Sequence, residues 1–491
     1  MRTSKHFIGM MIVGLSLGTA ACGKKGKKDD SNTPGKASAA VTDPSKASAE
    51  AKASFNEVAA RYKTAKQRGA LSAGTCEDLS KQFLKVYKDY GAQMAVAKFN
   101  AGAVWEECGN AEKAEDIYQQ LIQEVPKYDL SYNNLGVIYW NRRQEGKALD
   151  YFKRAVDANS ATKAPRNNLA AALRDKYSDS PDQDTFNKAE SELQRVLAVD
   201  SDNRLAYENL ARLYYDRGRL KDKSYLLLAD LVVTQAITKQ KTGSLGESAD
   251  IYNIKGLLFM QHDNQVDALK AFKKAVEIEK NHTDAHMNIA MIAIRFRDYK
   301  SAEESLNVAL KDRRQKKNVE AYLGLGVAQR GLRKYGDAEK AFKKAIEVKG
   351  SDPRALYNLG ILYHEHIGPE TERKNESGAF NKQPYETAMS YFDKFVSQSS
   401  GSKDLAKYSD DAKNRVSNIR DYFKNIEDMK KLEAEAKKLE EQAKKQEDEE
   451  KNRLRKLEEQ MRNQQTPATP PPADTAKPAD TKKPADPKKP K

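Results

Sequence analysis

Two cysteine thiols stand in the body of the chain where they can form a bond with each other. The sequence of 491 residues holds three cysteines, and Cys76 and Cys108 lie 32 residues apart. In an oxidising compartment such thiols pair when neighbouring helices bring them together. The pair is therefore a candidate disulfide, and the alternative is that both are small buried apolar side chains.

Residue types that catalyse reactions or bind metals are sparse. His282 and His286 are four residues apart and can share one face of a helix, whereas His364 and His366 are two apart and cannot. No carboxylate or cysteine near either pair completes a set of metal ligands, and the sequence has neither a glycine-rich phosphate loop nor a nucleophile motif. We therefore expect a protein that is not an enzyme and has no metal site, no cofactor and no small-molecule substrate.

A set of asparagines recurs along the chain, each two residues before a small residue. An amide side chain donates and accepts hydrogen bonds, so a row of amides can bind the backbone of an extended peptide whatever its side chains are. The alternative is that asparagine is simply common at this position. The six are Asn100, Asn134, Asn168, Asn209, Asn288 and Asn358.

The elements that must position these amides are helical hairpins that repeat about every 34 residues. Small residues recur at spacings of 34, 34, 41, 45, 34, 36 and 34, namely at Gly102, Gly136, Ala170, Ala211, Gly256, Ala290, Gly326 and Gly360. Sixteen residues after the small residue stands a large one, as at Phe152 and Phe272. The small residue lets two helices approach closely, and the large residue fills the gap between them.

This pattern resembles the tetratricopeptide repeat, in which pairs of helices stack into a superhelix. The resemblance covers residues 95–398 and implies an all-α solenoid of about eight repeats, with the asparagines as a ladder on its concave face. Two polar insertions, 176–187 and 364–384, are expected to be loops. Neighbouring concave positions would give specificity for a peptide, or else pack helices against each other. They are Trp140, Leu257, Met260, Met287, Met291 and Ile294.

The N-terminal segment predicts export and a lipid anchor. Residues 1–21 have the basic start and the apolar run of a signal peptide. The small residues before Cys22 resemble a bacterial lipobox, which implies that Cys22 is lipidated; the alternative is ordinary cleavage that leaves this thiol free. Residues 22–50 predict a flexible tether. No aspartate follows Cys22, which in Gram-negative lipoproteins favours the outer membrane, and we expect the chain to face the periplasm.

Further segments flank the repeats. Residues 51–94 predict an N-terminal helical hairpin. Residues 399–465 predict a long charged helix, which is either a coiled coil with a partner or a lone helix. Residues 466–491 hold eight of the sixteen prolines and predict a disordered tail. The net charge of +15 indicates an envelope surface or an acidic partner, because an exported lipoprotein does not normally meet nucleic acid.

The order of lipobox, repeat array, charged helix and Lys/Pro/Ala-rich tail resembles the tetratricopeptide lipoproteins of myxobacterial adventurous gliding motility. That resemblance implies a non-enzymatic scaffold that binds protein partners in a complex across the cell envelope. The alternative is an assembly factor for a secretin or a barrel protein, similar to pilotins, although these have fewer repeats and lack the charged helix.

Overall fold

The computed structural model describes residues 47–312, 315–349, 352–374 and 380–463. The predicted signal peptide, Cys22, most of the tether and the C-terminal tail lie outside these residues. The chain divides into two compact units, one that ends at Ala355 and one that begins at Leu356. Within the described ranges every regular element is a helix, as the repeat pattern predicts.

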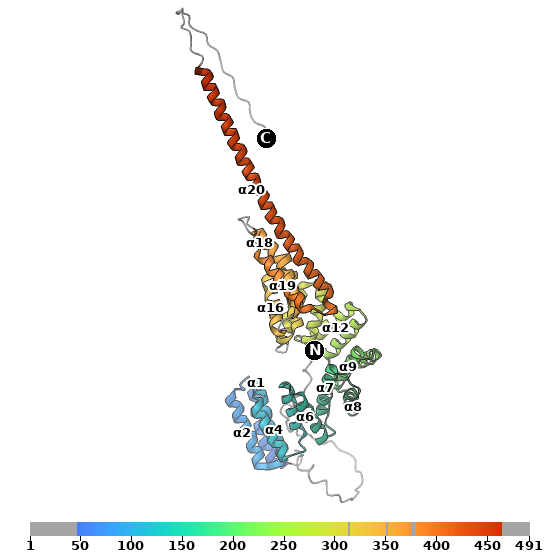
Figure 1. Ribbon diagram of the computed structural model, residues 1–491. Helices are drawn as coiled ribbons and strands as arrows, with labels where there is room; N and C mark the ends of the chain where they lie inside the picture. The colour runs from blue at the N-terminus through green and yellow to red at the C-terminus, as the bar shows by residue number, and fades with distance from the viewer. Residues whose placement is uncertain (1–46, 313–314, 350–351, 375–379, 464–491) are drawn as a thin grey trace, which may run out of the picture. The chain divides into compact units, whose positions relative to one another are not determined.

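In the first unit the helices follow one another as antiparallel pairs, joined by short turns (Figure 1). They are α1 (Ala49–Gln67), α2 (Ala73–Tyr90), η3 (Gly91–Met94), α3 (Ala95–Glu107), α4 (Ala111–Glu124), α5 (Asp129–Asn141), α6 (Glu145–Ala158), α7 (Lys163–Asp179), α8 (Gln183–Val199), α9 (Arg204–Leu220), α10 (Tyr225–Lys241), α11 (Ala249–Gln261), α12 (Gln265–Ile278), α13 (Thr283–Arg295), α14 (Tyr299–Ala309), η4 (Gln315–Lys317), α15 (Val319–Gly331) and α16 (Tyr335–Lys349).

Glycines set the close approach within several pairs. A Cβ atom added to Gly136 would lie 2.5 Å from the ring of Phe152, and one added to Gly256 would lie 2.4 Å from the ring of Phe272. Both rings are fully buried. The large residue therefore occupies the space that the missing side chain leaves, which confirms the pairing of small and large residues expected from their spacing.

The turn within a pair has one recurring conformation. In the first repeat, Gly109 has a φ of 76° and Asn110 then caps α4 by accepting a hydrogen bond from the amide of Lys113. Arg297 takes the same left-handed conformation, with a φ of 59°, and Asp298 caps α14. A left-handed residue ends one helix and the capping side chain starts the next, so the chain reverses within a few residues.

The second unit begins within α17 and contains a shorter set of helices. They are α17 (Pro353–Ile361), the π-helix η5 (Leu362–Ile367), α18 (Gly368–Lys374), α19 (Gln383–Ser399), η6 (Lys403–Leu405) and α20 (Ala406–Asn463).

Both insertions that we expected to be loops are largely helical. In the segment 176–187, α7 continues to Asp179 and α8 begins at Gln183, which leaves only a short connection. In the segment 364–384, the π-helix and α18 continue the helix as far as Lys374, α19 begins at Gln383, and residues 375–379 lie outside the described residues. The loop prediction was wrong because polar residues and a Gly-Pro pair are compatible with the exposed faces and the wider turns of helices.

The first turns of α20 pack against the rest of the second unit. Arg415 donates to Glu365 of the π-helix over 2.6 Å and to Asp411 over 2.6 Å. Asp411 also accepts a hydrogen bond from the hydroxyl of Tyr357. Further along, the ring of Tyr422 lies edge-on to the ring of Tyr385 in α19. Beyond this contact α20 continues as a single helix (Figure 1).

Candidate interaction surface

The structure buries most of the asparagine ladder. The side chains of Asn100, Asn134, Asn168 and Asn209 have no exposed area, whereas Asn288 and Asn358 are half-buried. A bound peptide would reach the four buried amides only after the helices around them had moved. Their role in binding a peptide stays a prediction, and in this structure they have a role in packing.

The buried amides hold successive helices together. The amide of Asn168 donates to Asn133 over 2.7 Å, and that of Asn288 donates to Asn253 over 2.9 Å. The amide of Asn134 donates to Glu106 over 2.7 Å. Each bond joins a helix of one repeat to the repeat before it, so the ladder links repeats instead of presenting free amides.

Asn209 departs from this pattern because it bonds to a buried cation. Arg174 is 1% exposed and donates to Asn209 over 2.8 Å and to Asp175 over 2.7 Å. A guanidinium without a carboxylate beside it would be costly at this depth, so the adjacent Asp175 is the partner that makes its burial tolerable.

A second polar column, which sequence reasoning missed, stands one residue before the ladder. Its members stand three residues before the small residue in four of the eight repeats, and all are buried: Asn133, Asn167, Glu208 and Asn253. Glu208 is the one carboxyl group in a column of amides. The sequence signal that could have revealed this column is the pairing of polar residues at these positions, as in Asn133-Asn134 and Asn167-Asn168.

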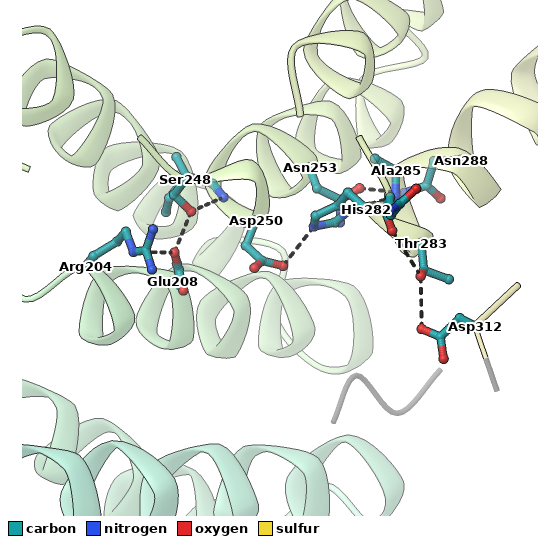
Figure 2. Close-up of polar contacts among 12 residues, drawn as sticks. Arg204, Glu208, Ser248, Asp250, Asn253, His282, Thr283, Ala285, Asn288 and Asp312 are labelled. Atoms are coloured by element: carbon teal, nitrogen blue, oxygen red, sulfur yellow. Dashed lines mark hydrogen bonds and ion pairs between the residues drawn. The ribbon is translucent and has the colours of Figure 1, made fainter. Parts of the chain in front are cut away.

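Figure 2 shows the contacts around Glu208. The hydroxyl of Ser248, which caps α11, donates to Glu208 over 2.5 Å, and the Arg204 guanidinium lies 3.5 Å from the same oxygen. Asp250 lies 3.1 Å from His282, which caps α13. Burial, reinforced by the negative charge of Asp250, raises the pKa of Glu208 to about 7. A cap of one helix thus bonds to an acid on the preceding repeat's helix.

The apolar positions expected beside the ladder do not form one surface. Trp140 and Met287 are buried. Leu257 and Met260 pack with Ile289 and Ile292 in one core cluster, whereas Ile294 packs in another with Met287. Met291 alone among the six is largely exposed, at 50%. The structure therefore uses five of them mainly for packing, which is the alternative that the sequence left open.

The two body cysteines lie at the junction between the first hairpin and the first repeat. Cys76 is fully buried in α2, and Cys108 caps the C-terminal end of α3. They form a disulfide, with Cα atoms 6.5 Å apart.

Two models of one family match separate stretches of the array. A model described as "Tetratricopeptide repeat" matches residues 182–222, 287–345 and 323–366, and a second model with the same description matches residues 130–162. The repeats are tetratricopeptide repeats. Repeats of this kind act as scaffolds for interactions between proteins, and proteins built from them are generally not enzymes.

Two curated proteins match about half of the chain. The protein O-mannosyl-transferase TMTC3 of Homo sapiens is 22% identical over 272 residues, which are 48% of this chain and 29% of the relative. The BBSome complex member BBS4 of Bos taurus is 24% identical over 271 residues, which are 53% of this chain and 48% of the relative. The chain spans less than half the length of either relative.

Two solved structures are similar to parts of the chain. YrrB, described as a TPR protein with an unusual peptide-binding site, is 14% identical with a TM-score of 0.23, and the match covers 49% of this chain and 96% of YrrB. PilF of Pseudomonas aeruginosa is 14% identical with a TM-score of 0.32, and the match covers 58% of this chain and 97% of PilF.

The tetratricopeptide array presents one exposed apolar face, on α10. Leu227, Leu228 and Leu231 are 72%, 40% and 63% exposed, and exposed Asp230 borders them on the same helix. Exposed apolar patches of this kind mark sites where proteins bind other proteins.

The described residues offer no metal centre and no membrane-spanning helix. Within those ranges no three His, Cys, Asp or Glu side chains lie close enough together to hold a metal ion. Over the same ranges, no helix combines the length and the apolar character needed to cross a bilayer.

Proposed function

We propose that this chain is a lipid-anchored, non-enzymatic scaffold that assembles a protein complex at the outer membrane and faces the periplasm. The observation that carries the proposal is the presence of separate exposed surfaces in one chain, on α10 of the array and on the outer part of α20. A lipobox-like Cys22 supports attachment to a membrane. BBS4, which is 24% identical to about half of this chain, is a BBSome complex member, and this supports a place in a multi-subunit assembly.

We further propose that the complex is the gliding motility machinery. This rests on the order of lipobox, repeat array, charged helix and Lys/Pro/Ala-rich tail. The competing proposal, an assembly factor for a secretin or a barrel protein, is an outcome of the same experiment. Photo-crosslinking residues placed at Leu231 and Leu439 should capture gliding-machinery subunits in intact cells. Capture of a secretin or barrel protein at both positions would overturn the motility assignment.

The anchor has its own test. Replacing Cys22 by alanine should release the protein from membranes into the soluble fraction, because the thiol that carries the lipid is gone. The double variant Cys76→Ala/Cys108→Ala is the matched control, and it should remain with the membranes. Continued sedimentation of the Cys22→Ala protein with membranes would contradict lipidation.

A further inference from the structure

The outer part of α20 is an isolated helix. Every side chain from Glu427 to Arg462 is exposed, and α20 runs on alone beyond α19 in Figure 1. At the rise of an α-helix this stretch is about 54 Å long. Its surface is therefore free for a partner along several turns.

A seven-residue repeat runs through this stretch. Lys-Lys-Leu-Glu occurs at 430–433 and again at 437–440, and Lys-Lys-Gln-Glu follows at 444–447. The repeat places an apolar stripe along one side of the helix, at alternating spacings of three and four residues. The stripe consists of Met429, Leu432, Ala436, Leu439 and Ala443, and it ends there because Gln446 and Glu450 take the next d and a positions.

Carboxylates border this stripe on both sides. In heptad terms the stripe holds positions a and d, and positions e and g beside it carry Glu433, Glu435, Glu440, Glu447, Glu449 and Asp428. The paired lysines, such as Lys437 and Lys438, lie farther round the helix at positions b and c. The helix therefore has an acid-flanked apolar stripe on one side and a basic surface behind it.

This charge pattern opposes pairing with a second copy of the chain. In a parallel pair, position g of one helix faces position e of the other, which would place Glu435 against Glu440. In an antiparallel pair, e faces e and g faces g, and acids again meet acids. A like-charge border thus favours a different partner over self-association.

The same pattern opposes insertion into a membrane surface. Helices that lie in an anionic membrane carry lysine or arginine beside the apolar face, whereas here acids stand there and the lysines point elsewhere.

We propose that residues 428–443 of α20 bind, as a two-helix coiled coil, a partner helix that has apolar a and d positions bordered by lysine or arginine. The small Ala436 and Ala443 leave room for larger a residues on the partner. The inference rests on the proposed scaffold function, since it gives the chemistry of one partner that the scaffold would hold.

The test titrates the full chain in detergent solution with two synthetic helical peptides. Both carry leucine at d and isoleucine at a; one has lysine at every e and g position and the other has glutamate there. We expect the lysine peptide to bind and to raise the helical circular dichroism signal, and the glutamate peptide not to bind. Equal binding of both peptides, or binding of neither, would overturn the inference.

Variants locate the binding surface. Leu432→Ser/Leu439→Ser and Glu433→Gln/Glu440→Gln should each weaken binding of the lysine peptide by about tenfold or more. The matched control Glu441→Gln/Asp448→Asn removes the same charge from the opposite side and should bind like the unaltered chain. Equal weakening in the control would show attraction to charge alone, and a dimer of the unaltered chain that Leu432→Ser/Leu439→Ser abolishes would show self-pairing; either result overturns the inference.

Because this titration does not depend on attachment, it separates the inference from the proposed function. Failure of peptide binding leaves the Cys22 result and the crosslinks from Leu231 on α10 untouched. Failure of those two experiments would remove the envelope scaffold while the peptide result stands.

Discussion

At the scale of single residues, glycine decides how closely two helices pack, because it carries no side chain. Gly136 and Gly256 sit in helix interiors, where glycine is weaker than alanine by about 1 kcal/mol. The structure explains why glycine stands there, because a ring fills the space beside each one.

The substitution Gly136→Ala should therefore destabilise the protein although it improves helix propensity. The added methyl group meets the Phe152 ring at 2.5 Å, and we expect a loss of about 1–3 kcal/mol in thermal or chemical unfolding. Gly146→Ala is the matched control, because a Cβ atom there meets nothing within 4 Å. In Gly136→Ala/Phe152→Leu the two losses should be less than additive; full additivity would contradict the clash.

The carboxyl group of Glu208 should make the stability of the array depend on pH. Its pKa is raised to about 7 from an ordinary value of 4.5, first by burial and then by Asp250, while Ser248, Arg204 and His282 oppose the rise. A carboxyl group with a raised folded-state pKa stabilises the fold below its unfolded pKa and loses that contribution as pH rises through the folded value. Stability should thus fall between about pH 5 and pH 8, by on the order of 3 kcal/mol.

Glu208→Gln places an amide in the column of amides and should remove this dependence. We expect the variant to be more stable than the unaltered chain at pH 8 and the difference to shrink towards pH 5, as measured by hydrogen exchange of α9 and α11. Glu247→Gln, an exposed acid beside the same junction, should keep the original pH slope. An identical slope in the Glu208→Gln protein would show that another group titrates.

The sequence predicts the positions of the ladder asparagines but not their hydrogen-bond partners or their burial. The six asparagines follow from the repeat, yet Asn134, Asn168 and Asn288 each bond to a residue 28 to 35 positions away in the chain. Burial of an amide depends on how tightly successive repeats pack, and a periodic pattern does not contain that quantity. For the same reason, spacing alone could not separate packing from binding for Met287 and Trp140.

At the scale of elements, the turn inside each hairpin combines a left-handed residue with a helix cap. Gly109 suits this conformation, whereas Arg143, Asp263, Arg297 and Arg333 adopt it with a side chain, at φ values between 53° and 63°. Left-handed backbone is unfavourable for residues other than glycine. Several repeats therefore carry local strain at equivalent positions.

Arg297→Gly should stabilise the protein, by about 0.5–1 kcal/mol, because the relief of backbone strain exceeds the added flexibility of the unfolded chain. The reverse change, Gly109→Ala, should destabilise it by about 1 kcal/mol. Both are measured by the midpoint of chemical unfolding. A loss of stability in Arg297→Gly would mean that the arginine side chain contributes more through its contacts than its backbone costs.

The π-helix is the element that was hardest to predict from the sequence. Gly368-Pro369 indicated a loop, because a proline ring clashes with the carbonyl group four residues earlier in an α-helix. The wider turns of Leu362–Ile367 change the hydrogen-bond register just before this proline, so the helix continues. The helix also gains Glu365 as the partner of Arg415, a contact that links residues 50 apart.

At the scale of the whole molecule, each repeat should be stabilised mainly by its contacts with the adjacent repeats. A repeat contacts mainly the repeats beside it, so damage in one place spreads little. The sequence predicted the stacked hairpins because each one carries the same local signal. It could not predict where the array divides into two units, since no single residue marks that boundary.

Loss of the disulfide should accordingly weaken only the N-terminal hairpins. Cys76→Ala/Cys108→Ala removes a closed loop of about one repeat, which in chain-entropy terms stabilises by about 4 kcal/mol. Hydrogen exchange should become faster in α1 to α4 and stay unchanged in α11 to α16. Uniformly faster exchange along the first unit would instead indicate one cooperative fold.

The same disulfide also sets the route along which tension travels. If the chain is pulled at its N-terminal end while a partner holds α20, the load crosses from Cys76 directly to Cys108. Residues 77–107 are then shielded, and roughly 100 Å of chain stays folded back instead of lengthening the tether. Such a covalent link would make the N-terminal end of the array stiff under load, and its reduction would let this end extend.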